Sequence, residues 1–430
     1  MRRGIVGSLA VLVVGGSLGL AQEAPGPALP SPVSEVPGPL APQDGDRALP
    51  AVAPEAPGER VWVGAEYLLW WLKRTPLPAP LVTTTSDLAA VPPAAFLQSG
   101  TSTLLGDDRL NPGVRSGGRF EAGVWIDDHR TISIEGSCFF LESHTVTQGV
   151  ASSGEPGSPL LAVPFFDADA QAESSFLLAA PGALSGGAAL SVTSRLQGAE
   201  VDGAVAVLTR PWLRLEVLAG FRYLDFRENL TFTTTSVGIQ APAPGSNNGL
   251  VLNTQDQFDS HDLFFGPQVG ARAECRLGNL FVEGTAKLAI GDVNQTTTIA
   301  GSATTNFFIA PPGGPFTGVS PQVVPGSGTF AQPSNTGQNN RHQIAWVPEV
   351  GVKVGYQLAP WARAFVGYEF LYASNFARPG EQIDRGINTA QTVQSAVAGN
   401  PPAPGTRPMV SPGGAVFWAQ GIDVGLELRY

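Results

Sequence analysis

Charged side chains in this chain recur on one side of segments whose other side is apolar. In residues 117–127, Arg119 and Glu121 alternate with Phe120 and Val124. Successive side chains of a β-strand point to opposite faces, so each such segment has a charged face and an apolar face. This rule gives 12 acids and 8 bases on the polar faces: Glu66, Arg119, Glu121, Glu135, Glu200, Asp202, Arg214, Glu216, Arg222, Arg272, Glu274, Glu283, Lys287, Glu349, Lys353, Arg363, Glu369, Asp423, Glu427 and Arg429.

Two kinds of chemistry follow if these polar faces line the lumen of a membrane barrel, whose apolar faces must meet lipid. The charges can line a narrow aqueous path that mildly favours cations. They can instead form an ion-pair network that fills the barrel, because charges at such depth are costly unless paired or hydrated. About eight strands leave room only for side chains, whereas about sixteen leave a channel, so about ten strands favour a narrow or plugged lumen.

The four histidines offer a weaker sign of chemistry. One lies in a short turn and three at the predicted rim of the barrel: His129, His144, His261 and His342. Acids predicted at the same rim are Glu142, Asp259 and Asp262. A histidine beside an acid can serve a surface hydrolase, but solvated rim residues are the simpler interpretation. The sequence has no HExxH motif and no phosphate-binding glycine loop, so we predict neither enzyme activity nor a cofactor.

Two cysteines complete the set of reactive side chains. Cys138 and Cys275 share the apolar parity of their segments. We therefore expect both to face lipid as small hydrophobic residues, with no disulfide and no metal.

Ten alternating segments would position these residues. They are residues 61–73, 117–127, 130–143, 191–209, 212–227, 258–275, 279–291, 341–357, 361–374 and 415–430. An even number of strands is the rule for bacterial outer-membrane barrels. The predicted fold is therefore all-β: a closed, up-and-down, antiparallel transmembrane β-barrel of about ten strands.

The links between these segments alternate strictly between short and long. The short links are residues 128–129, 210–211, 276–278 and 358–360, and the long ones are 74–116, 144–190, 228–257, 292–340 and 375–414. An up-and-down barrel places the two kinds at opposite ends. Outer-membrane barrels have short turns in the periplasm and long loops outside, which predicts both barrel termini in the periplasm.

The N-terminal part predicts export. Arg2 and Arg3 precede an apolar stretch, and small residues at 19–21 suit cleavage, so residues 1–21 are a predicted signal peptide. Residues 22–59 are rich in Pro, Ala and Gly and are predicted to be a disordered periplasmic tether. Residues 60–430 are the predicted barrel, in the bacterial outer membrane.

Composition agrees with a membrane barrel and excludes one class of partner. Charged residues make up 14% of the chain, against roughly 25% in soluble domains. The net charge of −11 argues against nucleic acid, since phosphates need a basic face. No mature segment has the run of apolar residues that a membrane helix requires.

Two further patterns predict partners. The chain ends on Tyr430, preceded by apolar residues at alternate positions, like the C-terminal strand signal that outer-membrane assembly machinery reads. Aromatic residues recur at the outer ends of the apolar faces, as in an interfacial girdle against outer-membrane lipid. They are Trp71, Phe140, Tyr223, Phe265, Trp346, Tyr372 and Trp418.

Two blocks of sequence resemble a known family. The block Ala65-Glu66-Tyr67-Leu68-Leu69-Trp70-Trp71-Leu72-Lys73, the following residues 76–84, and residues 118–125 are similar to the opening of the seventh putative beta-barrel porin family. The resemblance covers residues 60–430. It implies an outer-membrane barrel, with transport as the function that the family name suggests, and it supplies no catalytic residues.

Three hypotheses follow. The leading one is a non-enzymatic barrel with a narrow charged lumen that passes small polar solutes or ions. The second is a plugged structural or surface-display barrel that presents its long loops. The third is a hydrolase at the rim, which would depend on His261 or His144.

Overall fold

The computed structural model describes residues 60–239, 251–306, 308–309, 317–318, 322–393, 405–411 and 414–430. By internal contacts the chain divides into Met1–Ala48 and Leu49–Tyr430, and every described residue belongs to the second unit. The predicted signal peptide and tether lie outside the described residues. Within the described ranges, no helix is long and apolar enough to cross a membrane.

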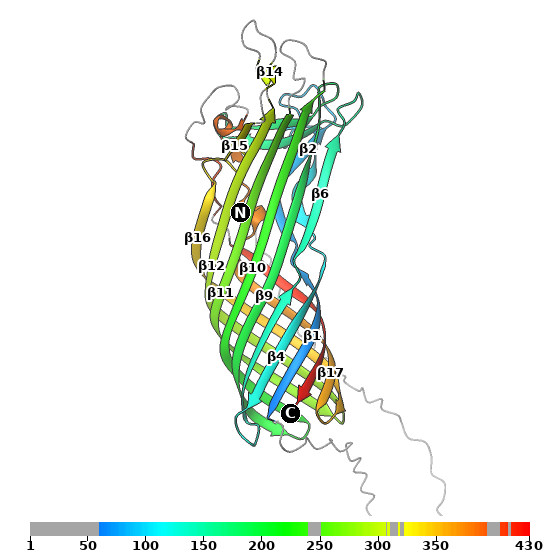
Figure 1. Cartoon of the computed structure of the whole chain (residues 1–430), viewed down its shortest axis with the longest axis vertical. Helices are drawn as coiled ribbons and strands as arrows, with labels where there is room; N and C mark the ends of the chain where they lie inside the picture. Colours follow the sequence, from blue (N-terminus) through cyan, green and yellow to red (C-terminus); the bar gives the residue numbers. More distant parts are fainter. Residues whose placement is uncertain are drawn as a thin grey trace, which may run out of the picture. The chain divides into compact units, whose positions relative to one another are not determined.

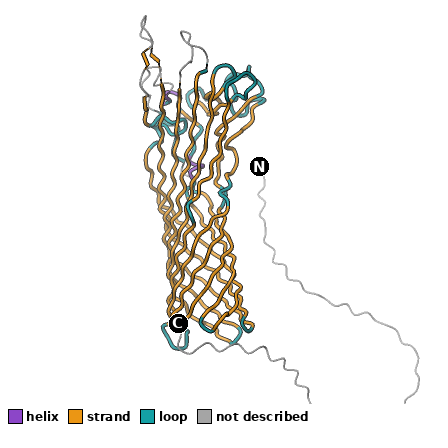
Figure 2. The backbone as a smooth tube through the Cα atoms, turned by 45° about the vertical axis from the view of Figure 1, so that its right-hand side comes forward, coloured by secondary structure: helices purple, strands orange, loops and turns teal. Residues whose placement is uncertain are grey.

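Ten antiparallel strands of the described chain pair in a ring (Figures 1 and 2). They are β1 (Val61–Leu72), β4 (Val114–Trp125), β5 (Ile132–Leu141), β9 (Leu184–Arg210), β10 (Leu213–Gly238), β11 (Val251–Leu277), β12 (Leu280–Asn306), β16 (Gly337–Ala359), β17 (Ala362–Phe376) and β19 (Ala415–Arg429). Each strand pairs with the next in this order, and β19 pairs with β1. Each of the ten predicted segments overlaps one strand of this ring.

The two faces of the long strands differ, and they exchange character along the length of the strand. On β10, Val217 and Phe221 are exposed on the outside, whereas Glu216 and Arg222 are buried on the inside. Beyond Tyr223 the outer positions are mostly polar and the inner positions are mostly apolar, for example Leu230. On these strands the part near the short links is therefore mainly apolar outside, and the part near the long links is mainly apolar inside.

The short links and both ends of the described chain lie at one end of the ring. The backbone N–H groups of Arg60 and Val61 donate to the carbonyl oxygen of Tyr430. Arg60 also pairs with Asp128 in the turn between β4 and β5. We call this the short-turn end, and the opposite end the long-link end.

The long links contain strands of their own. They are β2 (Thr75–Thr85), β3 (Thr101–Leu110), β6 (His144–Ser152), β7 (Leu161–Asp167), β8 (Ala172–Ala179), β13 (Phe308–Ile309), β14 (Thr317–Gly318), β15 (Gln322–Pro325) and β18 (Gly386–Ile387), with the 3-10 helices η1 (Pro379–Gln382) and η2 (Thr389–Gln391). Strands β18, β7, β2 and β3 pair in a second sheet, with β8 beside β7. This sheet and the segments packed on it form the cap.

Four ring strands are much longer than the sequence predicted. Strands β9 to β12 have 26 or 27 residues each, and their extra length lies at the long-link end. In Figure 1 these strands run side by side to the height of the cap. The predicted bounds were too short because the exchange of faces ends the apolar outer stripe before the strand itself ends.

Candidate functional site

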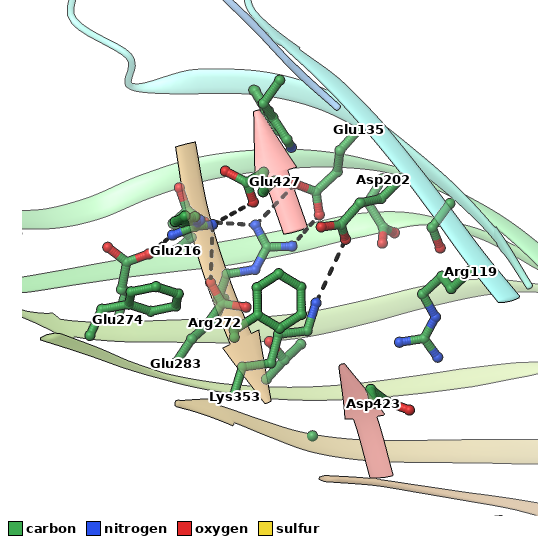
Figure 3. A pocket seen from close by; sticks show the side chains of 18 of the residues that line it. Arg119, Glu135, Asp202, Glu216, Arg272, Glu274, Glu283, Lys353, Asp423 and Glu427 are labelled. Carbon is green, nitrogen blue, oxygen red and sulfur yellow. Dashed lines mark hydrogen bonds and ion pairs between the residues drawn. The ribbon is translucent and has the colours of Figure 1, made fainter. Parts of the chain in front are cut away.

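The twenty predicted lumen residues all carry strand parity that directs them to the inside of the ring. Eighteen of them line one cavity of about 130 Å³ (Figure 3). The other two, Glu66 and Arg222, bond to residues that line it. The structure thus brings the predicted set together, while their role as the lining of a passage stays a prediction.

The first part of the network is centred on Arg119. Its guanidinium bonds to both carboxylate oxygens of Glu369, with 2.7 Å from Nη2 to Oε1, and lies 3.5 Å from Glu66. Glu66 also accepts from Lys353 Nζ at 2.6 Å, and Lys353 lies 3.7 Å from Glu121. Residues from β1, β4, β16 and β17 are therefore linked across the interior.

The second part surrounds Glu200. Arg222, which is in cross-strand register with Glu200, pairs with it and with Glu349 at 2.9 Å. Lys287 Nζ lies 2.6 Å from Glu200 and 2.9 Å from Asp202. Arg222 bridges acids on β9 and β16, whereas Lys287 of β12 holds two acids of β9, so these carboxylates are satisfied by protein groups.

Two further bases each bridge acids on two different strands. Arg272 pairs with Glu135 and, at 3.1 Å, with Glu216. Arg363 lies 2.8 Å from Glu274 and 2.6 Å from Glu427. Removing one partner from such a buried pair costs about 3–5 kcal/mol, because the other charge is left uncompensated. In this network, cations tie the strands together across the interior.

Aromatic side chains that the sequence analysis did not select also line the cavity. The guanidinium of Arg214 lies 4.5 Å from the ring centroid of Trp125, and that of Arg363 lies 4.7 Å from Phe281. A Cβ atom on Gly355 would overlap the Phe281 ring, so glycine is needed where this ring crosses the strand. Inward parity would have identified Trp125 and Phe281 as well, because both lie on the charged faces of their strands.

A cluster of buried apolar residues lies inside the ring on the long-link side of the network. Nine of the ten ring strands contribute buried residues to it: Leu68, Trp70, Leu72, Phe139, Leu141, Leu196, Leu224, Phe226, Phe264, Ala289, Val293, Ala345, Val347, Leu371, Ala373, Phe376, Phe417 and Ala419. Trp70 joins it to the network below, since its indole N–H donates to Asp423 at 2.6 Å. We call these residues the apolar level.

A buried polar level follows, and it holds the chain after β17 inside the ring. Arg378 Nε lies 2.7 Å from Glu228, with each side chain 1% exposed. Thr75, at the start of β2, donates to the same carboxylate at 2.6 Å. The carboxylate of Asp262 accepts from the backbone N–H of Ala377 at 2.9 Å.

The cap closes on the inner faces of the long strands through a second apolar core. Leu81 of β2 and Phe165 of β7 belong to the same buried cluster as Phe232 of β10 and Ile299 of β12. Asp256 of β11 lies here, fully buried. One carboxylate oxygen accepts from the backbone N–H groups of residues 330 and 331, at 2.9 and 2.7 Å. Burial raises the pKa of Asp256 to about 7, although these hydrogen bonds act in the opposite direction.

Two of the rim histidines pair with acids other than Glu142, Asp259 and Asp262. His261 bonds to Asp225 at 3.0 Å, and His342 bonds to Asp292 at 2.8 Å. The side chain of Asp262 is buried inside the ring. His144 lies on β6, so the three rim histidines stand on three different strands.

No group of three or more metal-ligating side chains occurs in the part of the chain that the structure describes. Cys138 and Cys275 are both exposed free thiols, on the outward parity that the sequence predicted.

Comparisons with known proteins give one match over most of the chain. The model of a family described as Putative beta barrel porin-7 matches residues 62–430. No curated protein matches the chain.

Solved structures are similar only at a low level. The outer membrane protease OmpT from Escherichia coli is 11% identical, with 87% of this chain and 97% of that chain covered and a TM-score of 0.37. A FadL homologue of Pseudomonas aeruginosa is 8% identical, with 89% and 95% covered and a TM-score of 0.20. OmpT of Vibrio cholerae is 10% identical, with 88% and 100% covered and a TM-score of 0.13. Scores this low support no inference about fold or function.

Proposed function

This chain belongs to the Putative beta barrel porin-7 family, and from that premise we propose that it is a bacterial outer-membrane β-barrel with a filled interior. In this proposal the barrel is a non-enzymatic structural protein that holds a folded cap at the cell surface. It is the second of the three hypotheses drawn from the sequence, now with a physical basis for the plug.

The height of the apolar outer stripe supports the membrane setting. On β10 the stripe runs from Leu213 to Tyr223, which is 11 residues. At about 3.3 Å per residue and a tilt of about 45°, such a stretch is about 25 Å tall, the height of the apolar band of outer-membrane barrels. The rest of β10 then stands outside the bilayer, where its polar outer face suits water.

The orientation follows from the same comparison. Outer-membrane barrels keep short turns in the periplasm, so we assign the short-turn end to the periplasm and the cap to the outside. An epitope inserted after Gly157, in an exposed turn of the cap, should be accessible on intact cells. One inserted beside Pro211, in the turn between β9 and β10, should not be, and the reverse result would overturn the orientation.

The apolar level is the main observation that supports a filled interior. Trp70, Phe264 and Phe417 have no exposed surface, although they point to the inside of the ring. Ions avoid such a region because it offers no compensation for lost hydration. A polar level and the cap core lie beyond it, so a solute would meet three packed levels in series.

A narrow passage is the second candidate, and the charged cavity favours it. Twelve acids against eight bases give the predicted lumen residues a formal charge of −4, which suits small cations. This candidate requires the apolar level to separate during transport. In a passage, the twenty charged residues line the path of the solute. In a filled barrel, the same residues hold the strands together.

Two cysteine positions on β12 distinguish these candidates. Thr285 lines the charged cavity, and Ala289 lies four residues further along the same face with no exposed surface. In a background lacking Cys138 and Cys275, we expect a small charged thiol reagent to modify Thr285→Cys and to spare Ala289→Cys. Comparable modification of both would overturn the filled interior.

Conductance tests the same point on the unmodified protein. Purified protein in a planar bilayer should give no current above the lipid background, next to an open general porin as positive control. Discrete current steps would favour the passage instead. Deletion of the gene should weaken the envelope or reduce surface binding, because in this proposal the protein acts by placing its folded barrel and cap in the outer membrane.

Assembly requires one further partner in this proposal. We assign the C-terminal strand β19, which ends beside the exposed aromatic Tyr430, to recognition by outer-membrane assembly machinery. Replacing Tyr430 with a charged residue should lower the amount of assembled barrel. An unchanged amount in the outer membrane would contradict this assignment.

A further inference from the structure

Three basic residues form a row on the outside of the ring, just beyond the apolar stripe. Arg195 on β9, Arg227 on β10 and His261 on β11 are in direct cross-strand register. All three have outward parity, and the side chain of Arg227 is 55% exposed. The longest strands of the ring thus carry three adjacent cationic or ionisable groups at one level.

The protein compensates only part of this charge. Like charges directly opposite on neighbouring strands are destabilising, and Arg195 and Arg227 are such a pair. Asp225 is the one carboxylate among the described residues that pairs with the row, with 3.1 Å to Arg227 and 3.0 Å to His261. Arg195 donates to the neutral amide of Gln197 at 2.7 Å and has no ion pair within the described chain. The row therefore has unused positive charge and free donors directed outward.

The surface next to the row has the character of a lipid interface. The rings of Tyr223 and Phe265 pack against each other beside it, with centroids 5.0 Å apart and planes tilted by 41°. On the far side of this aromatic pair, Phe221 and Val269 are exposed and apolar. Aromatic pairs of this kind mark the level of lipid headgroups on membrane proteins. A ligand at the row would meet cations at one end and an apolar wall at the other.

We propose that Arg195, Arg227 and His261 bind the anionic phosphate headgroup of a membrane lipid. This proposal rests on the membrane setting of the proposed function. Guanidinium groups match phosphate oxygens in a fork geometry, and the aromatic pair packs against the first carbons of the acyl chains. The apolar wall favours a lipid over free phosphate, which would gain nothing from it.

Native mass spectrometry and titration of the purified protein with phosphatidylglycerol in detergent test the site. Each basic side chain at a lipid surface adds a comparable increment of affinity, so the double variant R195Q/R227Q should bind about thirtyfold more weakly. The matched control R109Q/R407Q removes two exposed arginines from the cap and should bind like the unmodified protein. Equal affinity of R195Q/R227Q and the control would overturn the proposal.

Two further experiments distinguish a lipid headgroup from free phosphate, and the headgroup site from the membrane setting itself. Inorganic phosphate in excess should not displace the lipid; displacement would mean a free-anion site and would overturn the lipid assignment. All variants should enter nanodiscs of phosphatidylcholine. Failure of every variant to enter would contradict the membrane setting itself, whereas entry without preference for phosphatidylglycerol would contradict only the headgroup site.

Discussion

Asp256 gives the cap a pH dependence that can be measured. It lies on β11 beyond the apolar outer stripe, with no exposed surface, and it holds the backbone of Phe330 and Ala331. Its other carboxylate oxygen has no hydrogen-bond partner within the described chain. Burial raises the pKa of Asp256 from 3.8 to about 7, so the closed cap favours the protonated form.

The direction of this pH dependence follows from the number of protons bound by the closed and open caps. When the segment around Phe330 opens, Asp256 meets water and its pKa returns to the ordinary value. Between about pH 4 and pH 7 the closed cap then binds one more proton than the open one, so closure weakens as the pH rises. The change is about three pKa units, which corresponds to about 4 kcal/mol or a roughly thousandfold change in the opening equilibrium. Above about pH 7 both forms are ionised and the dependence ends.

The substitution Asp256→Asn removes the titration and keeps an oxygen that accepts the two N–H bonds. Hydrogen exchange of residues 328–336, corrected for intrinsic rates, should show opening that increases from pH 4 to pH 7 in the unmodified protein. The opening of the variant should be constant over this range. Asp259→Asn is the matched control, because Asp259 faces outward on the same strand. Equal pH dependence of the unmodified protein and Asp256→Asn would refute the reasoning.

Three further outcomes follow from the described contacts. Glu228→Gln leaves Arg378 buried without its carboxylate and should destabilise the cap by about 3–5 kcal/mol, measured by denaturant unfolding, whereas an effect below about 1 kcal/mol would contradict the buried pair. Val217→Arg places a charge within the outer apolar stripe and should lower the free energy of unfolding, measured by reversible bilayer refolding, by about 2–4 kcal/mol. Asn229→Arg, which lies beyond the stripe, should lower it by less than about 1 kcal/mol. Equal losses for the two variants would contradict the assigned membrane level. Export should yield a mature chain that begins at Gln22, and an intact N-terminus by mass spectrometry would refute the predicted cleavage.

The sequence was sufficient to find the strands of the ring because each has a stretch with one apolar face and one polar face. Period-two alternation located a segment for each ring strand, and parity directed the charged residues inward. The ends of the long strands were missed for a physical reason. On β10, Leu224 and Phe226 follow Tyr223, so the apolar residues move from the outer to the inner parity while the strand continues. A search for one continuous apolar face ends at this exchange.

Strand parity could not predict which charged residues pair with each other in the network. Parity states which face a residue lies on, but not which strands face each other across the interior. Arg119 and Glu369 are 250 residues apart and meet only because β4 and β17 both flank the pair β1 and β19. The cap was missed because its apolar residues, such as Leu81 and Phe165, lie in proline-containing segments that show no period-two alternation.

The exchange of faces also explains why charges fill the interior at one level and apolar groups at another. A strand with apolar residues on both faces would have no preferred register, because a slip of one residue would cost little. Buried ion pairs add little stability compared with apolar packing, so stability alone does not account for twenty charged residues. In the proposed membrane setting, where the outside is apolar, as at Phe221, the charged inner neighbour Arg222 specifies which face enters lipid. Where the outside is polar, as at Thr231, the apolar inner neighbour Leu230 performs the same task. In the proposed filled barrel, the network therefore fixes the register of the strands at the level of the membrane.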